Sequence, residues 1–271
     1  MDPNSKISIV QNTDLKIDQS NSILQNIKSN YFLERTYNNI LKKKSLEIVK
    51  YNKKIQNRIN LSIIDYKEYS EKFTQIEIEI IPCYYIYGRF INIEENQKLF
   101  YHIFFNDNKE EIENKYSINE EDKVRKIRIV IDYQVKSFEN LFKNCKCIHY
   151  INFKKFHRNN IENMSYMLYE CLFLEELNLS NFKTNNVSDM SHMFECCKSL
   201  KELNISNFDT SNATDMRFMF NQCLKLKEIK GINNFNTKNI NDMCAIFQEC
   251  NSLEFLDLSN FDTFNVILKC I

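Results

Sequence analysis

The spacing of apolar residues changes along the chain and divides it into four regions. Residues 1–22 are mostly polar and are expected to form a disordered tail. In residues 23–73, apolar positions recur at helical spacing among basic ones, which predicts a helical N-terminal segment. In residues 74–137 they alternate or run together, as in TQIEIEIIP and RKIRIVIDY, which predicts strands. From residue 138 to 271, two spacings alternate within one repeating unit.

The repeating units begin at Phe138, Met164, Met190, Met216 and Met243, 26 or 27 residues apart. The M-x-x-M-F-x-x-C text places apolar residues at i, i+3, i+4 and i+7, which predicts a two-turn helix, whereas L-x-L predicts a strand. A short acidic side chain precedes the opening Met in three units, where it would cap free N–H groups: Asp189, Asp215 and Asp242. Each unit is therefore predicted to be strand, turn and short helix.

A unit of this length cannot bury its apolar side chains alone, so the units are expected to stack. Residues 138–266 resemble the BspA-type leucine-rich repeat, M-x-x-M-F-x-x-C-x-x-L-x-x-L-x-L-S-x-F-D-T-S-x-V-T-x-M. The resemblance implies an α/β leucine-rich-repeat solenoid of about five coils, with a parallel sheet on the concave face, and a role in interaction or adhesion. Because the first coil of such a stack would expose apolar side chains, the strands of residues 74–137 are predicted to form its N-terminal cap.

Composition and charge argue against several classes of function. The chain has 36 basic and 36 acidic residues, so nothing in its net charge favours nucleic acid or anionic lipid. Two glycines leave no phosphate-cradling loop, and no catalytic motif is visible, which predicts a protein that is not an enzyme and needs no cofactor. No run is long and apolar enough to span a membrane, and the first residues lack the plan of a signal peptide. The expected location is therefore cytoplasmic.

Cysteine occupies the eighth position of every unit: Cys145, Cys171, Cys197, Cys223 and Cys250. One cysteine per coil does not provide the paired C-x-x-C spacing of a zinc site. Neighbouring coils are also expected to hold these residues too far apart for disulfides. The expectation is a structural column of small, buried side chains that binds no metal.

The residues between the buried positions of L-x-x-L-x-L should point out of the predicted sheet. They include glutamates, asparagines and, at both ends, aromatic residues, and we expect them to bind another protein. Five strands about 4.8 Å apart give a face only about 25 Å wide, so the partner should also touch the cap. The predicted partner-binding residues are Tyr150, Asn152, Glu176, Asn178, Glu202, Asn204, Glu228, Lys230, Phe255 and Asp257.

Two other functions stay open. Residues 23–60 faintly resemble an F-box, through Tyr31-Phe32-Leu33, Ile40-Leu41 and the Leu46–Val49 stretch, although the usual proline is missing. This resemblance implies a substrate receptor of a cullin ubiquitin ligase. A surface adhesin of the BspA type is the other alternative. The text after Val266 supplies no second cap, so the tail folds under, the chain dimerises there, or repeats continue beyond Ile271.

Overall fold

The computed structural model describes residues 53–58 and 74–262, which belong to two units, residues 1–70 and 71–271. In the first unit it describes the short helix α4 (Lys53–Arg58), in which Ile55 is buried. This helix lies within the segment expected to be helical. The expected tail at 1–22, the other helices of 23–73 and most of the F-box-like text lie outside the described residues.

Three antiparallel strands form the first part of the second unit. They are β1 (Ile76–Pro82), β3 (Tyr101–Phe105) and β5 (Ile127–Ile131), and β5 pairs with both of the others. Burial alternates along each strand, with isoleucines inside in β1 and β5, and with Tyr101, Ile103 and Phe105 inside in β3. The short strands β2 (Gly88–Arg89) and β4 (Ser117–Ile118) pair separately, and the 3₁₀ turns η1 (Glu95–Phe100) and η2 (Glu120–Asp122) connect the strands.

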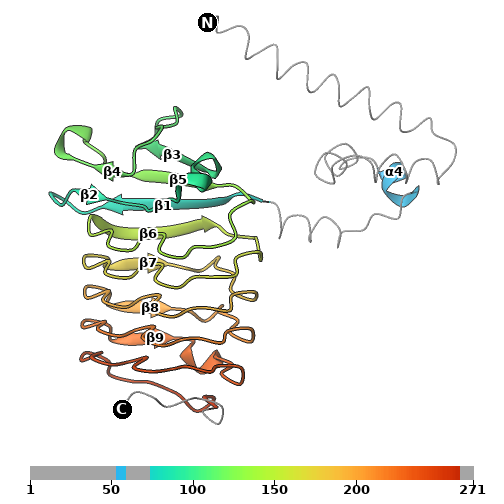
Figure 1. The fold of residues 1–271 in the computed structure, drawn as a ribbon, viewed down its shortest axis with the longest axis vertical. Helices are drawn as coiled ribbons and strands as arrows, with labels where there is room; N and C mark the ends of the chain where they lie inside the picture. The colour runs from blue at the N-terminus through green and yellow to red at the C-terminus, as the bar shows by residue number, and fades with distance from the viewer. Residues whose placement is uncertain (1–52, 59–73, 263–271) are drawn as a thin grey trace, which may run out of the picture. The chain divides into compact units, whose positions relative to one another are not determined.

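The repeats follow as a stack below these strands (Figure 1). Their strands are β6 (Ile148–Lys155), β7 (Glu176–Asn178), β8 (Glu202–Asn204) and β9 (Glu228–Lys230). β6 pairs with β7 and β8 with β9 in parallel, whereas β6 pairs with β1 antiparallel. The first strands and the repeats therefore share one mixed sheet, in the order β3-β5-β1-β6-β7, and β8 and β9 form a second one.

The predicted helices of the repeats are wrong, because the M-x-x-M-F-x-x-C segments form consecutive turns. In residues 164–171, alternate N–H groups bond to the next repeat, as from Tyr166 to the carbonyl of Ser191 at 3.0 Å. The intervening ones close turns, as from Tyr169 to the carbonyl of Tyr166 at 3.2 Å. An α-helix would bond each N–H four residues back within its own segment. Here the next repeat adopts the same conformation, and its backbone carbonyls accept these N–H groups instead.

The third and seventh residues of each turn segment have left-handed backbone angles. In the second repeat they are Tyr166 and Glu170, both with φ of 55°, and the pattern recurs at His192 and Cys196 in the third. A left-handed residue every four positions is incompatible with a right-handed helix. The expected α/β leucine-rich-repeat solenoid of strand-turn-helix coils is therefore wrong. The described second unit consists mainly of mixed sheet and turns.

The predicted caps accept backbone N–H groups, although turns rather than helices follow them. The Asp189 carboxylate accepts from the N–H of Ser191 at 2.9 Å, and Asp242 accepts from that of Cys244 at 2.8 Å. Asp215 does the same for Arg217 at 3.0 Å. Each aspartate side chain thus accepts the N–H group two residues further along the chain, and this local hydrogen bond defines the start of the turn segment.

One glycine has a clear structural role. Gly231, with φ of 89°, follows β9, in the repeat that carries one additional residue. A Cβ atom there would lie 2.3 Å from the Cα of Ser206 in the preceding repeat. Glycine therefore permits both the left-handed backbone and the close approach between the two repeats.

Apolar side chains form one core that runs from the first strands into the fourth repeat. Like residues meet across repeats, as in the parallel stacking of Phe194 and Phe220 with ring centroids 5.5 Å apart. Among the described residues, no helix combines the length and apolar character needed to cross a membrane.

Candidate binding surfaces

The outward-facing side chains of the sheet place three glutamates in one row. Parallel pairing aligns Glu202 with Glu228, and Glu176 occupies the same position on the adjacent strand β7, next to Tyr150 of β6. All three glutamates are exposed. Glu228 lies 3.3 Å from Lys230, whereas Glu176 and Glu202 have no ion-pair partner within the described ranges.

The neighbouring row consists of Asn152, Asn178, Asn204, Lys230 and Asp257. Two of its amides accept bonds from the turns that follow, Asn178 from the N–H of Ser180 at 3.0 Å and Asn204 from that of Ser206 at 3.1 Å. The Asp257 carboxylate accepts equivalently from Ser259, and this backbone hydrogen bond lowers its pKa. Part of this row therefore shapes the turns as well as facing outward.

The aromatic ends of the first row differ from each other. Tyr150 is half-buried on β6, whereas Phe255 has 74% of its surface exposed. Residues 254–258 form no strand, so the fifth repeat departs from the predicted parallel sheet. Phe255 and Asp257 extend the surface without being held by strand pairing.

The cysteines at the eighth position lie against the preceding repeat. Cys171, Cys197 and Cys223 are fully buried, and their thiols donate to the carbonyls of Phe142, Leu168 and Phe194 at 3.1–3.3 Å. Burial raises the pKa of each of these thiols well above its usual range. Cys250 bonds in the same way to Phe220, and burial raises its pKa to about 11. Cys145 is buried in the first repeat, where its thiol faces the Lys143 carbonyl.

These thiols are therefore held as neutral hydrogen-bond donors. A thiolate is the form that attacks electrophiles and binds metal ions. Groups of three or more histidine, cysteine or acidic side chains that would hold a metal ion are absent from the residues the structure describes.

A second set of buried side chains also links the repeats and was not singled out from the sequence. Thr184 donates its hydroxyl to the carbonyl of Asp209 at 2.9 Å and accepts the N–H of the same residue at 2.8 Å. Thr210 clamps Asn236 in the same way, and Thr237 clamps Asp262. The signal available in the sequence was a threonine two residues after the recurring phenylalanine in four successive repeats, at positions 184, 210, 237 and 263.

Arg158 occupies the corresponding position in the first repeat. Its side chain is fully buried and donates one bond to the carbonyl of Asp132 at 2.7 Å, towards the first strands. Its Nε and other terminal nitrogen have no hydrogen-bond partner, and burial lowers the pKa of Arg158 to about 10. The threonine clamp is thus missing at one junction, between the first and second repeats.

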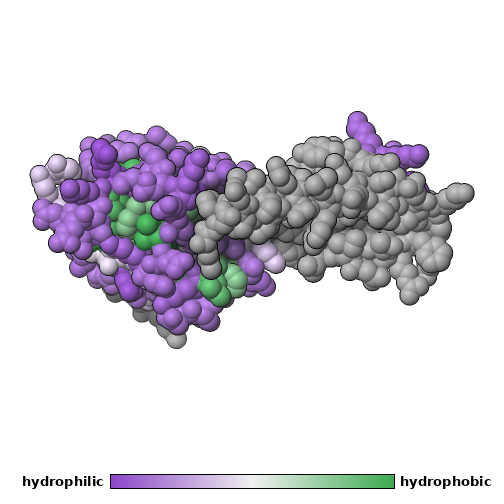
Figure 2. All heavy atoms as spheres, turned by 90° about the horizontal axis from the view of Figure 1, so that it is seen from above, coloured by the Kyte–Doolittle hydropathy of each residue, from purple (hydrophilic) through white to green (hydrophobic). Residues whose placement is uncertain are grey.

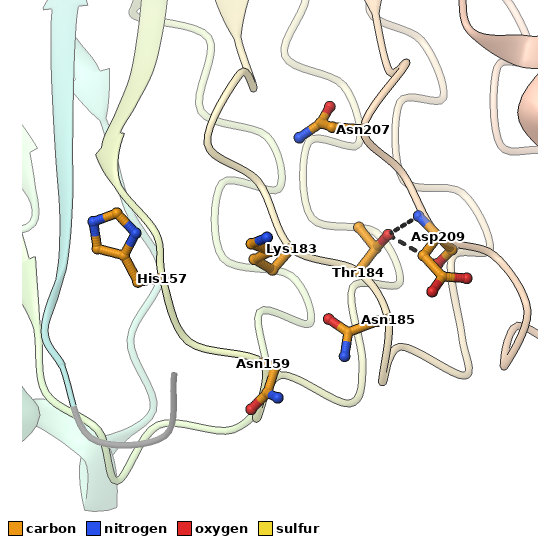
Figure 3. Close-up of a pocket in the computed structure, with 7 residues that line it drawn as sticks. All are labelled: His157, Asn159, Lys183, Thr184, Asn185, Asn207 and Asp209. Atoms are coloured by element: carbon orange, nitrogen blue, oxygen red, sulfur yellow. Dashed lines mark hydrogen bonds between the residues drawn. The ribbon is translucent and has the colours of Figure 1, made fainter. Parts of the chain in front are cut away.

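A polar pocket of about 240 Å³ opens at this junction. Figure 3 shows Lys183 between His157 and Thr184, with Asn159 and Asn185 along one margin. Asn207 lies along the opposite margin, and Asp209 completes the lining. The pocket draws on three successive repeats, and within residues 74–262 its lining contains no phenylalanine or tyrosine.

The β3 edge carries a different cavity, of about 330 Å³. Seen from this end, the molecule shows a hydrophobic area among hydrophilic side chains (Figure 2). The lining includes Leu99, which is 85% exposed, and His102, whose ring contacts Glu111 at 3.0 Å and Asp132 at 3.4 Å. Although burial opposes it, hydrogen bonding to the two carboxylates raises the pKa of His102.

Comparison with protein families gives one match. Residues 136–254 and 203–268 match the model described as "Mycoplasma protein of unknown function, DUF285", a family associated with BspA-like repeats. Together the matches span just under half of the chain. The expected assignments to the leucine-rich-repeat family and to the F-box family are wrong, because neither family model matches. Comparisons with curated proteins and with solved structures gave no match.

Proposed function

We propose that this chain is a non-enzymatic interaction protein that holds a protein partner against the outward face of its sheet. The observation that carries the proposal is the row of exposed glutamates at positions 176, 202 and 228, which occupy the same position on successive repeat strands, with Glu202 and Glu228 directly paired. Like charges directly opposite one another on neighbouring strands disfavour the folded state. The fold does not need this row, which supports a role in recognition.

The charge of the row favours a partner with basic side chains. Strands about 4.8 Å apart bring the carboxylates close enough for one partner segment to cross all three. Basic groups on that segment would relieve the repulsion between the glutamates and add complementary charge, which raises association rates and selectivity.

The sheet offers more area than the repeats alone. β1, β5 and β3 continue the same sheet beyond β6 and add about 14 Å of width at the usual strand spacing. A standard interface covers about 800 Å² on each partner. The proposed partner therefore contacts both the repeats and the first strands.

The test is affinity capture from lysate of the native cells, with bound proteins quantified by mass spectrometry. We expect Glu176→Lys plus Glu202→Lys to abolish capture of the partner without changing the thermal unfolding midpoint, since both side chains are exposed. Glu121→Lys plus Glu162→Lys is the control, because it makes the same change in net charge at exposed positions elsewhere. Equal capture by the two double variants would contradict the proposal.

A further inference from the structure

The pocket at the first junction differs from the later junctions in its backbone hydrogen bonding. In later repeats the N–H and carbonyl groups of Asp209, Asn236 and Asp262 are clamped by a threonine. The corresponding residue at the first junction is Lys183, and the structure gives its N–H and carbonyl no hydrogen bond among the described residues. Arg158 does not replace the clamp, because its guanidinium turns to Asp132 instead.

The side chains around the pocket also keep unused hydrogen-bonding capacity. Lys183 and His157 are exposed and have no ion-pair partner in the described part of the chain. The side-chain amides of Asn159 and Asn185 likewise make no hydrogen bond there. By contrast, Asn207 donates its amide to the carbonyls of Leu179 and Phe182. The free groups thus include the donors of the Lys183 ammonium, of its backbone N–H and of two side-chain amides, and the ammonium adds a positive charge.

Asp209 is the one acidic residue among the described residues that line the pocket. One of its carboxylate oxygens accepts from the N–H of Ser211 at 3.0 Å and from its hydroxyl at 2.6 Å. These bonds occupy that oxygen and hold the carboxylate over its own turn. The pocket therefore offers a ligand more hydrogen-bond donors, from the lysine and the free amides, than negative charge from the aspartate.

We propose that this pocket binds a small oxyanion, a phosphate or carboxylate group, through Lys183 with support from His157 and the amides of Asn159 and Asn185. Charge-assisted hydrogen bonds from a lysine and neutral amides are the usual means by which proteins hold such groups. The cavity, of about 240 Å³, accommodates a group of this size. This site is separate from the glutamate row, which has the opposite charge.

The experiment is an amide NMR titration of the full-length protein with inorganic phosphate and with acetate, at constant ionic strength and pH 7. We expect saturable shifts of the amide signals around Lys183. Lys183→Met should weaken binding about tenfold, as loss of a charge-assisted hydrogen bond requires. Asp209→Asn should strengthen binding, because it removes the opposing charge. Asparagine occupies the equivalent position 236 in the next repeat, where it accepts the N–H of Lys238.

Lys225→Met is the matched control, because Lys225 is an exposed lysine that does not line the pocket. It should bind both anions as the unmodified protein does. The absence of saturable shifts with either anion would overturn the proposal. The proposal would also be overturned if Lys183→Met and Lys225→Met weakened anion binding equally, or if Asp209→Asn weakened it.

The two probes separate the sources of the anion. Stronger binding of phosphate supports a phosphorylated ligand, whereas stronger binding of acetate supports a carboxylate, such as an acidic side chain. Either ranking supports the oxyanion site, provided that the binding depends on Lys183.

Discussion

The first strands and the repeats use their polar side chains in opposite ways. In β1 and β5, apolar side chains are buried and charged ones such as Glu77 and Arg128 lie on the outside, while backbone pairing holds the strands together. In the repeats, buried threonine and cysteine side chains bond to the neighbouring repeat. The comparison teaches that short strands of three residues need additional links, and that polar side chains provide them at regular intervals.

The largest effect is expected from the apolar core of the repeats. Phe194→Ala should lower the free energy of unfolding by about 3–5 kcal/mol, because the ring is fully buried against Phe220. Phe173→Ala is the control, since this ring is 42% exposed in the adjacent repeat and should cost much less. Denaturant unfolding measures both. Similar losses for the two variants would show that burial in the stack does not govern its stability.

An intermediate effect is expected from the threonine clamps. Thr210→Val keeps the shape of the side chain but leaves the N–H and carbonyl of Asn236 without their partner, which should cost about 1–3 kcal/mol. Thr214→Val should cost less, because Thr214 is exposed and makes one bond, to Ser188. The same denaturant measurements apply. If Thr210→Val proves harmless, the clamps do not link the repeats.

The smallest effect is expected in the first strands, from His102. Its pKa is raised above 6.5 by the carboxylates of Asp132 and Glu111, against the effect of burial. The protonated ring therefore stabilises the folded state below about pH 6.5, and this contribution is lost as pH rises through the raised pKa. His102→Gln should remove that pH dependence. The measurement is the difference in unfolding free energy between the unmodified protein and the variant, followed from pH 5 to 9.

Glu111→Gln sharpens the same test. It removes one of the two carboxylates that contact His102, so it should reduce the pH-dependent difference without abolishing it. A difference between the unmodified protein and His102→Gln that stays constant with pH would contradict the argument.

The sequence predicted the first strands well and the interior of the repeats less well. Alternation along IEIEI and IRIVI has one structural solution, a half-buried strand. The M-x-x-M-F-x-x-C spacing is compatible with two structures, a two-turn helix and a series of consecutive turns, because both bury the first, fourth, fifth and eighth residues. Left-handed positions are the deciding difference, and residues as unlike as Tyr166, His192 and Phe218 occupy them. No residue type marked them.

The candidate sites follow the same division. The three glutamates are exposed on their strands, and Glu202 pairs directly with Glu228, while their role in binding a partner stays a prediction. The pocket at Lys183 was missed, because it depends on where the Arg158 side chain turns. Its only trace in the sequence is an arginine in place of a recurring threonine.

The backbone hydrogen bonds between successive turn segments all run in one direction along the stack. N–H groups in these segments point from each repeat to the next, four per junction, so their dipoles add. At the end nearest β1, the side-chain amide of Asn92 donates to backbone carbonyls of the first turn segment, those of Asn140 at 2.9 Å and Lys143 at 2.8 Å. At the other end, the N–H groups of Met243, Ala245 and Phe247 have no acceptor among residues 74–262. The dipoles of the turn segments thus point their positive ends toward the last repeat, while backbone bonds elsewhere in each repeat, such as that from the Ser188 N–H to the Glu162 carbonyl, run the other way and offset part of this polarity.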